Sequence, residues 1–131
     1  MKINKVYPVV FSKEDDGTFC VYAPDFLGCV TEADDYADGI DKIRDGICGM
    51  LYALERDKKT APEPSEPGEV ELEAGDVVAL VDVDLLDYKR RIGSKAVRRT
   101  ISIPEYLDEM ATRAGVSLSQ ITQDALRSML L

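Results

Sequence analysis

The first part of the chain alternates apolar and polar residues in short runs, a pattern typical of β-strands. Residues 6–11 and 18–23 each carry apolar side chains at every second position, and the Asp-Asp-Gly sequence at 15–17 between them is a turn signal. The two runs therefore predict a β-hairpin. Because Pro8 has no N–H to donate, the first strand should lie at a sheet edge or have its nitrogen side free. Residues 28–31 predict a short third strand.

From residue 35 onward the apolar spacing changes to three and four residues, which predicts a helix. Asp35 is its expected N-cap, and Asp38 completes a variant of the capping box. Gly39, Gly46 and Gly49 weaken this helix, so it should depend on packing against the sheet, and the glycines allow close approach. The apolar stripe consists of Tyr36, Ile40, Ile43, Ile47, Leu51 and Leu54.

Residues 60–76 hold three prolines and six acidic residues, so they predict a loop or extended linker. The apolar run at 77–81, which continues to Asp84, predicts a buried central strand. The resulting order is β-β-β-α-β, which predicts a small α+β domain over residues 1–85. A basic linker is expected at 86–96.

A different pattern fills residues 97–131. Alternation over 97–103 predicts one strand, although Arg99 interrupts its apolar face. Pro104 suits the first position of a helix, and Gly115 suits the position just after its end. Ser117 then opens a second helix with an S-x-x-Q capping box. The segment therefore predicts a β-α-α module.

This module has about 35 residues, which is too few for an independent core, and a single strand cannot form a sheet. We expect a homodimer in which two copies of the strand pair antiparallel and four helices bury a shared core, with further pairing into a tetramer left open. The expected core residues are Val97, Ile101, Ile103, Leu107 and Ile121.

Such a two-stranded ribbon fits the major groove of DNA, where Arg, Thr and Ser can hydrogen-bond base edges. Serines at a helix N-terminus lie where free backbone N–H groups favour phosphate. The expected DNA-binding residues are Arg98, Thr100 and Ser102 on the outward face of the ribbon, with Lys95, Ser117 and Ser119 at phosphates.

Charge is divided unevenly along the chain. The 131 residues include 25 acidic and 16 basic side chains, a net charge of −9. Residues 1–84 hold 20 acids and 8 bases, whereas residues 85–131 hold 5 acids and 8 bases, six of them between Lys89 and Arg99. This asymmetry favours two modules with different partners. The alternative is an acidic surface that aids solubility and a solvated basic linker.

The composition excludes several kinds of chemistry. With no histidine, the chain has no Ser-His-Asp or Cys-His catalytic unit, no histidine general base and no histidine-bearing zinc site. Its three cysteines, without a CxxC, argue against a disulfide framework and fit a soluble protein of the reducing cytoplasm, with no membrane segment. Asp25, Asp82 and Asp84 could be imagined as a metal cluster, but alternating Asp on a strand usually forms its solvent face. We expect no metal, no cofactor and no catalytic residue.

Two stretches resemble known families. The sequence from Arg98 to Leu130 resembles the ribbon-helix-helix DNA-binding fold, through its alternating strand, the proline at the helix start and the G-V-S-x-S turn at 115–119. The first module resembles the HicB-type antitoxins, through Tyr-Pro at 7–8, the Asp-Gly turn at 16–17 and P-D-x-x-G-C-x-T at 24–31. Phe-Leu at 26–27 replaces the usual Leu-Pro, and a glycine at position 39 replaces the usual alanine.

The resemblance implies an antitoxin of a toxin–antitoxin pair. The first module would bind and block a HicA-type toxin, a short basic ribonuclease that cleaves mRNA, and the second would bind operator DNA and repress the pair's own promoter. An acidic module suits a basic partner, and a basic ribbon suits DNA. Two alternatives are a ligand-sensing ribbon-helix-helix repressor that binds a small organic molecule, and an enzyme with a ribonuclease H-like core, which only scattered acids support.

Overall fold

The computed structural model describes residues 4–131, which fall into two compact units. The N-terminal unit extends to Ser94, and the C-terminal unit comprises Lys95–Leu131. The first three residues of the predicted first module lie outside the described residues. The two units are described separately below.

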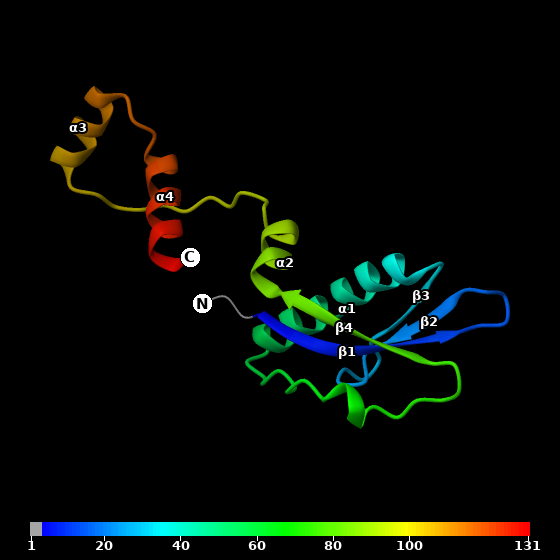
Figure 1. Cartoon of the computed structure of the whole chain (residues 1–131). Coiled ribbons are helices and arrows are strands. Elements are labelled where there is room, and N and C mark those ends of the chain that lie inside the picture. Colours follow the sequence, from blue (N-terminus) through cyan, green and yellow to red (C-terminus); the bar gives the residue numbers. More distant parts are fainter. Residues whose placement is uncertain (1–3) are drawn as a thin grey trace. The chain divides into compact units, whose positions relative to one another are not determined.

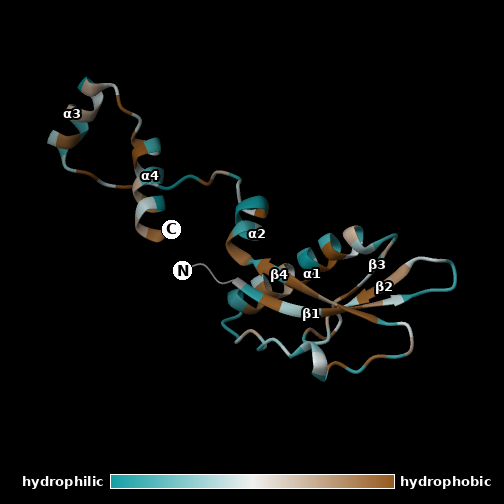
Figure 2. Ribbon diagram, viewed as in Figure 1, coloured by the Kyte–Doolittle hydropathy of each residue, from teal (hydrophilic) through white to brown (hydrophobic). Residues whose placement is uncertain are grey.

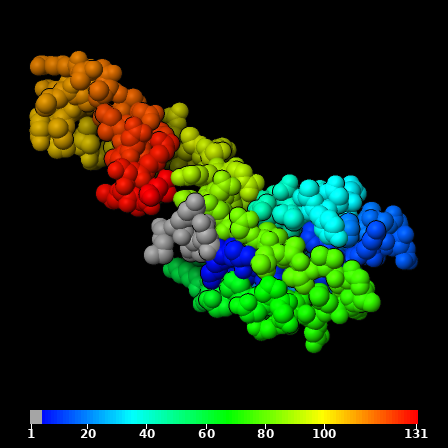
Figure 3. Space-filling view, in the orientation of Figure 1, coloured from blue at the N-terminus to red at the C-terminus, as the bar shows by residue number. Residues whose placement is uncertain are grey.

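A four-stranded antiparallel sheet forms the framework of the N-terminal unit (Figure 1). Its strand order is β3-β2-β1-β4, and helix α1 (Tyr36–Arg56) packs on one face. Residues 60–76, which include the short helix η1 (Pro67–Glu69), pass along the other face (Figures 1 and 3). The strands are β1 (Asn4–Lys13), β2 (Phe19–Tyr22), β3 (Val30–Ala33) and β4 (Val77–Asp84). The chain therefore has the α+β class that its sequence predicts.

The hydrophobic core lies between α1 and the sheet. The predicted face of the first strand is confirmed, because Tyr7, Val9 and Phe11 are all fully buried. Residues 81 and 83 of β4, the strand coloured apolar along much of its length in Figure 2, extend the same layer. The predicted stripe of α1 supplies the opposite side: Ile43, Ile47 and Leu51 are buried, and Ile40 and Leu54 pack at the edges.

Gly39 lets α1 approach the sheet closely. A Cβ atom at this position would lie 2.4 Å from Cε2 of Phe11 and 3.1 Å from Cγ2 of Val21. The Phe11 ring therefore fills the space that an alanine methyl group would need. Phe11 also makes an edge contact with Tyr36, with ring centroids 5.1 Å apart. The start of α1 thus packs closely around one aromatic ring, which leaves no room for an alanine side chain at position 39.

The first strand is longer than residues 6–11 and lies inside the sheet, not at its edge. Its nitrogen side is nevertheless free at Pro8, as the sequence allowed. β2 pairs only with Val10–Lys13, whereas Pro8 pairs with Leu80 of β4. The proline therefore lies beyond the end of the β2 ladder, where a missing N–H interrupts no pairing with β2.

The third strand begins two residues later than residues 28–31, the predicted range. Residues 23–29 form a tight loop, in which the Ala23 N–H donates to the Cys29 carbonyl and the Cys29 N–H donates to the Phe26 carbonyl. The N–H of Cys29 is thus used inside the loop, while its carbonyl still bonds to the residue that follows β2. Only from Val30 does the chain pair with β2.

Helix α2 (Leu85–Ile92) occupies most of the segment expected to be a basic linker, so the structure corrects that expectation. The Asp84 side chain caps it by accepting from the Asp87 N–H at 3.1 Å. Leu85 is buried in the core, and Tyr88 packs against it. This packing extends the N-terminal unit beyond the predicted boundary at residue 85, to Ser94.

The Pro- and Glu-rich segment 60–76 is irregular over most of its length, as predicted, but it is tied to the sheet. The Tyr7 hydroxyl donates to the Pro62 carbonyl at 2.8 Å. Asp25 accepts from both the N–H and the hydroxyl of Ser65. Burial, with the nearby carboxylates of Asp25 and Glu63, raises the pKa of Tyr7 to about 12. Tyr7 therefore remains a neutral hydrogen-bond donor at physiological pH.

The C-terminal unit contains two helices, α3 (Glu105–Ala114) and α4 (Leu118–Leu130). The predicted helix ends are confirmed: Gly115 is left-handed at φ 68°, and the Ser117 hydroxyl accepts from the Gln120 N–H at 3.2 Å. Residues 97–103 form no strand within the single chain. A strand needs a hydrogen-bonding neighbour, and this unit contains no other extended segment that could supply one.

We predict that Gly39→Ala destabilises the N-terminal unit by about 1–3 kcal/mol, because the new methyl group overpacks against the Phe11 ring. Gly49→Ala in the same helix is the control, since its Cβ would meet only the hydroxyl of Tyr88 at 3.3 Å. That variant should gain helix propensity, by up to about 1 kcal/mol. Urea denaturation of both variants checks the difference, and equal midpoints would show that Phe11 does not constrain residue 39.

Candidate binding surfaces

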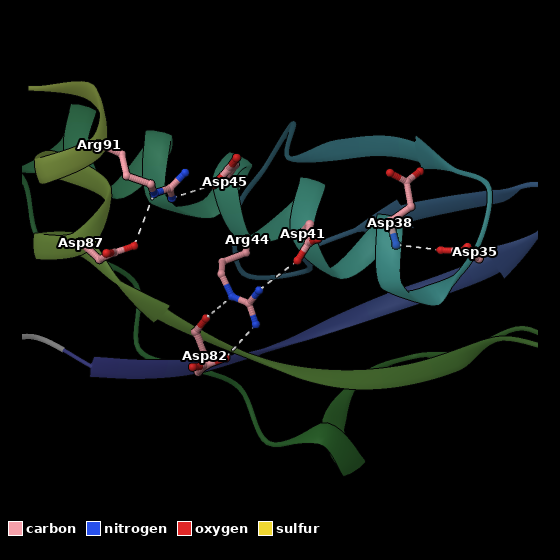
Figure 4. A network of polar contacts seen from close by, with 8 residues as sticks. All are labelled: Asp35, Asp38, Asp41, Arg44, Asp45, Asp82, Asp87 and Arg91. Atoms are coloured by element: carbon pink, nitrogen blue, oxygen red, sulfur yellow. Dashed lines mark hydrogen bonds and ion pairs between the residues drawn. The ribbon is translucent and has the colours of Figure 1, made fainter.

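The acidic side chains on the outer side of α1 are largely paired with cations of the same chain (Figure 4). Arg44 connects α1 to β4, because its Nε donates to the Asp82 carbonyl and its guanidinium pairs with the Asp82 carboxylate, both at 2.9 Å. Arg44 also reaches Asp41 at 3.4 Å. The hydrogen bond from Arg44 lowers the pKa of Asp82 below its usual value. This network fixes the helix over the sheet.

Two cations of α2 complete this network. Arg91 pairs with Asp45 of α1 at 3.0 Å and with Asp87 of its own helix at 3.3 Å (Figure 4). Lys89 pairs with Glu55 near the end of α1. The hydrogen bond from Lys42 likewise lowers the pKa of Asp38. These ion pairs are exposed, so each contributes little stability. Together, four cations offset part of the charge of the six carboxylates that they contact.

A groove of about 680 Å³ lies on the opposite face of the sheet, between the outer side chains of β1 and β2 and the segment 65–76. Six carboxylates line it, and no lysine or arginine does. Apolar side chains from Tyr22, Pro24, Val70 and Leu72 form part of its walls. The acidic residues are Glu14, Asp25, Glu69, Glu71, Glu73 and Asp76.

The carboxylates of this groove contribute to raised pKa values of neighbouring uncharged side chains. Burial and the carboxylates of Asp76 and Glu73 raise the pKa of Tyr22. Burial and the carboxylates of Glu14, Glu32 and Asp76 raise the pKa of the Cys20 thiol. A raised pKa keeps the thiol protonated and unreactive. Cys29 and Cys48 are buried.

Asp25 positions one wall of the groove, a role that the sequence analysis missed. Its two oxygens accept from the Ser65 backbone and side chain, 40 residues further along the chain. The sequence analysis considered a metal cluster of Asp25, Asp82 and Asp84 and favoured a solvent-facing role instead; in the structure Asp82 is bonded to Arg44 of α1. Among the described residues, no three His, Cys, Asp or Glu side chains are grouped as metal ligands would be.

A second, more apolar groove of about 480 Å³ adjoins Asp25. Met50, Ala53 and Leu54 from the last turns of α1 form one wall, and the loop residues Phe26 and Leu27 form the other. The Leu27 side chain is 100% exposed. A fully solvated leucine beside an apolar depression is a feature of surfaces that bind other proteins.

The basic run at 89–99 divides into two groups by its contacts. Lys89 and Arg91 are engaged with acids of α1 and α2, as described above. Within the described part of the chain, the other four have no ion pair: Arg90, Lys95, Arg98 and Arg99. The last three belong to the C-terminal unit.

The expected base-reading residues Arg98, Thr100 and Ser102 lie on one exposed, irregular segment with Lys95. The single chain does not form the two-stranded ribbon that would present them. Ser117 lies at the N-cap of α4, and Ser119, in the first turn, accepts from the Gln123 amide at 3.2 Å. The two serines thus lie at a helix N-terminus, as the sequence predicts.

The expected dimer-core residues are exposed in the single chain. The C-terminal helices have no buried residue, although each carries an apolar stripe. Tyr106, Met110 and Leu126 are also solvated. The five predicted core residues have exposed fractions of 82% for Val97, 57% for Ile101, 37% for Ile103, 42% for Leu107 and 49% for Ile121.

None of the helices in the described part of the chain combines the length and the apolar character that crossing a bilayer requires.

Three comparisons place the chain among known proteins. No curated protein matches it. Among solved structures, it is similar to a chain of a toxin–antitoxin complex from Streptococcus pneumoniae, with 20% identity, a TM-score of 0.62 and coverage of 97% of this chain and 99% of the other. It is also similar to the Burkholderia pseudomallei antitoxin HicB, with 25% identity, a TM-score of 0.56 and the same two coverages.

A chain of a HicA3 and HicB3 toxin–antitoxin complex matches 61% of this chain and 99% of its own length, with 23% identity and a TM-score of 0.50. The model of the HicB-like antitoxins of bacterial toxin–antitoxin systems matches residues 7–126, nearly the whole chain. The chain therefore belongs to the HicB-like antitoxin family.

Proposed function

We propose that this antitoxin binds and inhibits a HicA-type, mRNA-cleaving toxin through its N-terminal unit, and represses its own operon by binding operator DNA through its C-terminal unit. The observation that carries the proposal is the separation of charge. Unpaired carboxylates gather around a groove of the N-terminal unit, and unpaired cations occupy the start of the C-terminal unit. Opposite charges on separate units suit a basic protein and a nucleic acid as partners.

The DNA-binding role rests on a ribbon-helix-helix dimer. The C-terminal unit has apolar helix stripes with nothing of its own chain to cover them, and a strand-like segment without a partner strand. A second copy of the chain would supply both the apolar surface that covers the helices and the partner strand. Pairing residues 97–103 antiparallel would turn Ile101 and Ile103 inward and place Arg98, Thr100 and Ser102 on the outer face, where they can enter the major groove.

Toxin inhibition should need only the N-terminal unit. A fragment of residues 1–94 should rescue the growth of cells that express the toxin. A fragment of residues 1–85 should rescue poorly, because it lacks α2, whose Lys89 and Arg91 hold α1 and whose Tyr88 covers the core. Circular dichroism establishes that each fragment is folded. If a folded 1–94 fragment fails to rescue, toxin binding lies elsewhere.

Base recognition should depend on the outer face of the ribbon. Arg98→Ala should weaken operator binding by about 1–3 kcal/mol if its guanidinium contacts a guanine at two positions. Lys95→Ala should weaken binding to all DNA sequences alike and flatten the salt dependence, because it contacts phosphate only. Fluorescence anisotropy with operator and scrambled DNA separates the two effects. Unchanged operator affinity in an Arg98/Thr100/Ser102 triple alanine variant would contradict the assignment.

Dimerisation should be a condition for DNA binding. Ile101→Asp would bury a carboxylate in the shared core, which is strongly unfavourable without a cationic partner. The variant should sediment as a smaller species and lose operator binding, while it still binds the toxin. Thr100→Asp, on the opposite face of the same segment, is the control and should remain associated. An Ile101→Asp variant that stays dimeric and binds the operator normally would refute the ribbon arrangement.

A further inference from the structure

Acidic residues of the N-terminal unit differ in whether the chain itself neutralises them. On the α1 side, Asp41, Asp45 and Asp82 are bonded to Arg44 or Arg91. A cationic partner on that side would have to displace existing guanidinium groups. In the groove on the opposite face, five carboxylates have no cation partner among the described residues: Glu14, Glu69, Glu71, Glu73 and Asp76. The electrostatic attraction for a cationic partner is therefore strongest at the groove.

The groove is formed before any partner arrives. One wall of the groove is the Pro- and Glu-rich segment 60–76. The hydrogen bond from Tyr7 to the Pro62 carbonyl and the two hydrogen bonds from Ser65 to Asp25 hold this segment. Lys5 adds an ion pair to Glu63 at 3.6 Å. Because the backbone that carries these carboxylates is tethered to the sheet in the free protein, binding costs less conformational entropy than it would with a disordered acidic tail.

An apolar anchoring point lies immediately beside the acidic groove. Asp25 lines both depressions, and the second one is walled by Met50, Leu54 and the fully exposed Leu27. Protein interfaces commonly combine a small apolar centre, which slows dissociation, with charged surroundings, which speed association. The two grooves together have this composition, whereas the acidic groove alone would not distinguish a protein from a simple cation.

We propose that a protein partner docks across Asp25, with its lysine- and arginine-rich face over the acidic groove and an apolar side chain in the neighbouring groove against Leu27. The inference rests on the proposed function, in which this partner is the toxin. The inference adds to that function the surface of the N-terminal unit on which the toxin binds. The charged half should set the association rate, and the apolar half should set the dissociation rate.

The test uses the full-length chain and a HicA-type toxin, co-expressed from the adjacent reading frame and inactivated by substitution. Glu71→Lys should slow association roughly tenfold and weaken the dependence of the rate on salt. Its control is Glu109→Lys, which changes the net charge equally but lies on α3 of the other unit. Leu27→Ala should speed dissociation roughly tenfold with little effect on association. Both N-terminal substitutions are at exposed positions, so thermal unfolding should not change.

The outcomes are distinct for the two proposals. If the unmodified chain does not bind the toxin, the proposed function fails, and this inference fails with it. If it binds, but Glu71→Lys behaves like Glu109→Lys and Leu27→Ala like the unmodified chain, the toxin binds another surface and only the inference fails. If Asp34→Lys, an exposed substitution just before α1 and outside the groove, slows association as much as Glu71→Lys, attraction depends on net charge alone and the groove is not the contact.

Discussion

The main constraint on this molecule is that one of its units can bury its apolar side chains and the other cannot. The N-terminal unit has a sheet and a helix that cover each other, so Tyr7, Phe11 and Ile47 are removed from water within one chain. The C-terminal unit has two short helices with no buried residue. Burial of apolar surface is the main favourable contribution to folding. In the proposed dimer a second copy of the chain would cover these helices, whereas the first unit has a core of its own.

The net charge of the first module does not show which of its acidic residues are paired with cations. A count along the sequence gives the first module a large excess of acid, spread over strands, helix and loop alike. Arg44 and Arg91 bond four of the acids near α1 and β4, and Lys89 bonds another. The remaining negative charge is concentrated in the Pro- and Glu-rich segment and the strands beneath it. Arg44 and Arg91 each bond two acids and thereby connect neighbouring elements. The α1 side and the groove side of the unit therefore differ in where unpaired carboxylates lie.

Local patterns predicted most of the helices and strands, but the strand expected at the centre of the sheet, β4, lies at its edge. The limits of prediction follow from contacts distant in sequence. The helix stripe, the N-cap at Asp35 and the helix end at Gly115 depend on neighbouring residues, which the sequence displays directly. Helix α2 was missed because its eight residues contain only a short apolar pattern, and it is held by the packing of Leu85 and Tyr88 against a core built from distant parts of the chain. The bond from Ser65 to Asp25 spans 40 residues and follows no periodicity. The predicted ribbon depends on a second chain, so residues 97–103 remain irregular in one copy.

Contacts in the structure explain why the P-D-x-x-G-C stretch at 24–29 has these residue types. Pro24 ends the second strand, and Gly28 has a φ of 85°, a conformation that residues with a side chain rarely adopt. Cys29 is buried, and its carbonyl accepts from the Ala23 N–H to close the loop. Asp25 is thereby held where its carboxylate can bind Ser65 and fix the acidic segment over the sheet. This stretch therefore supports one wall of the acidic groove, while the side chain of Leu27 at the loop tip takes part in none of these contacts and is fully exposed.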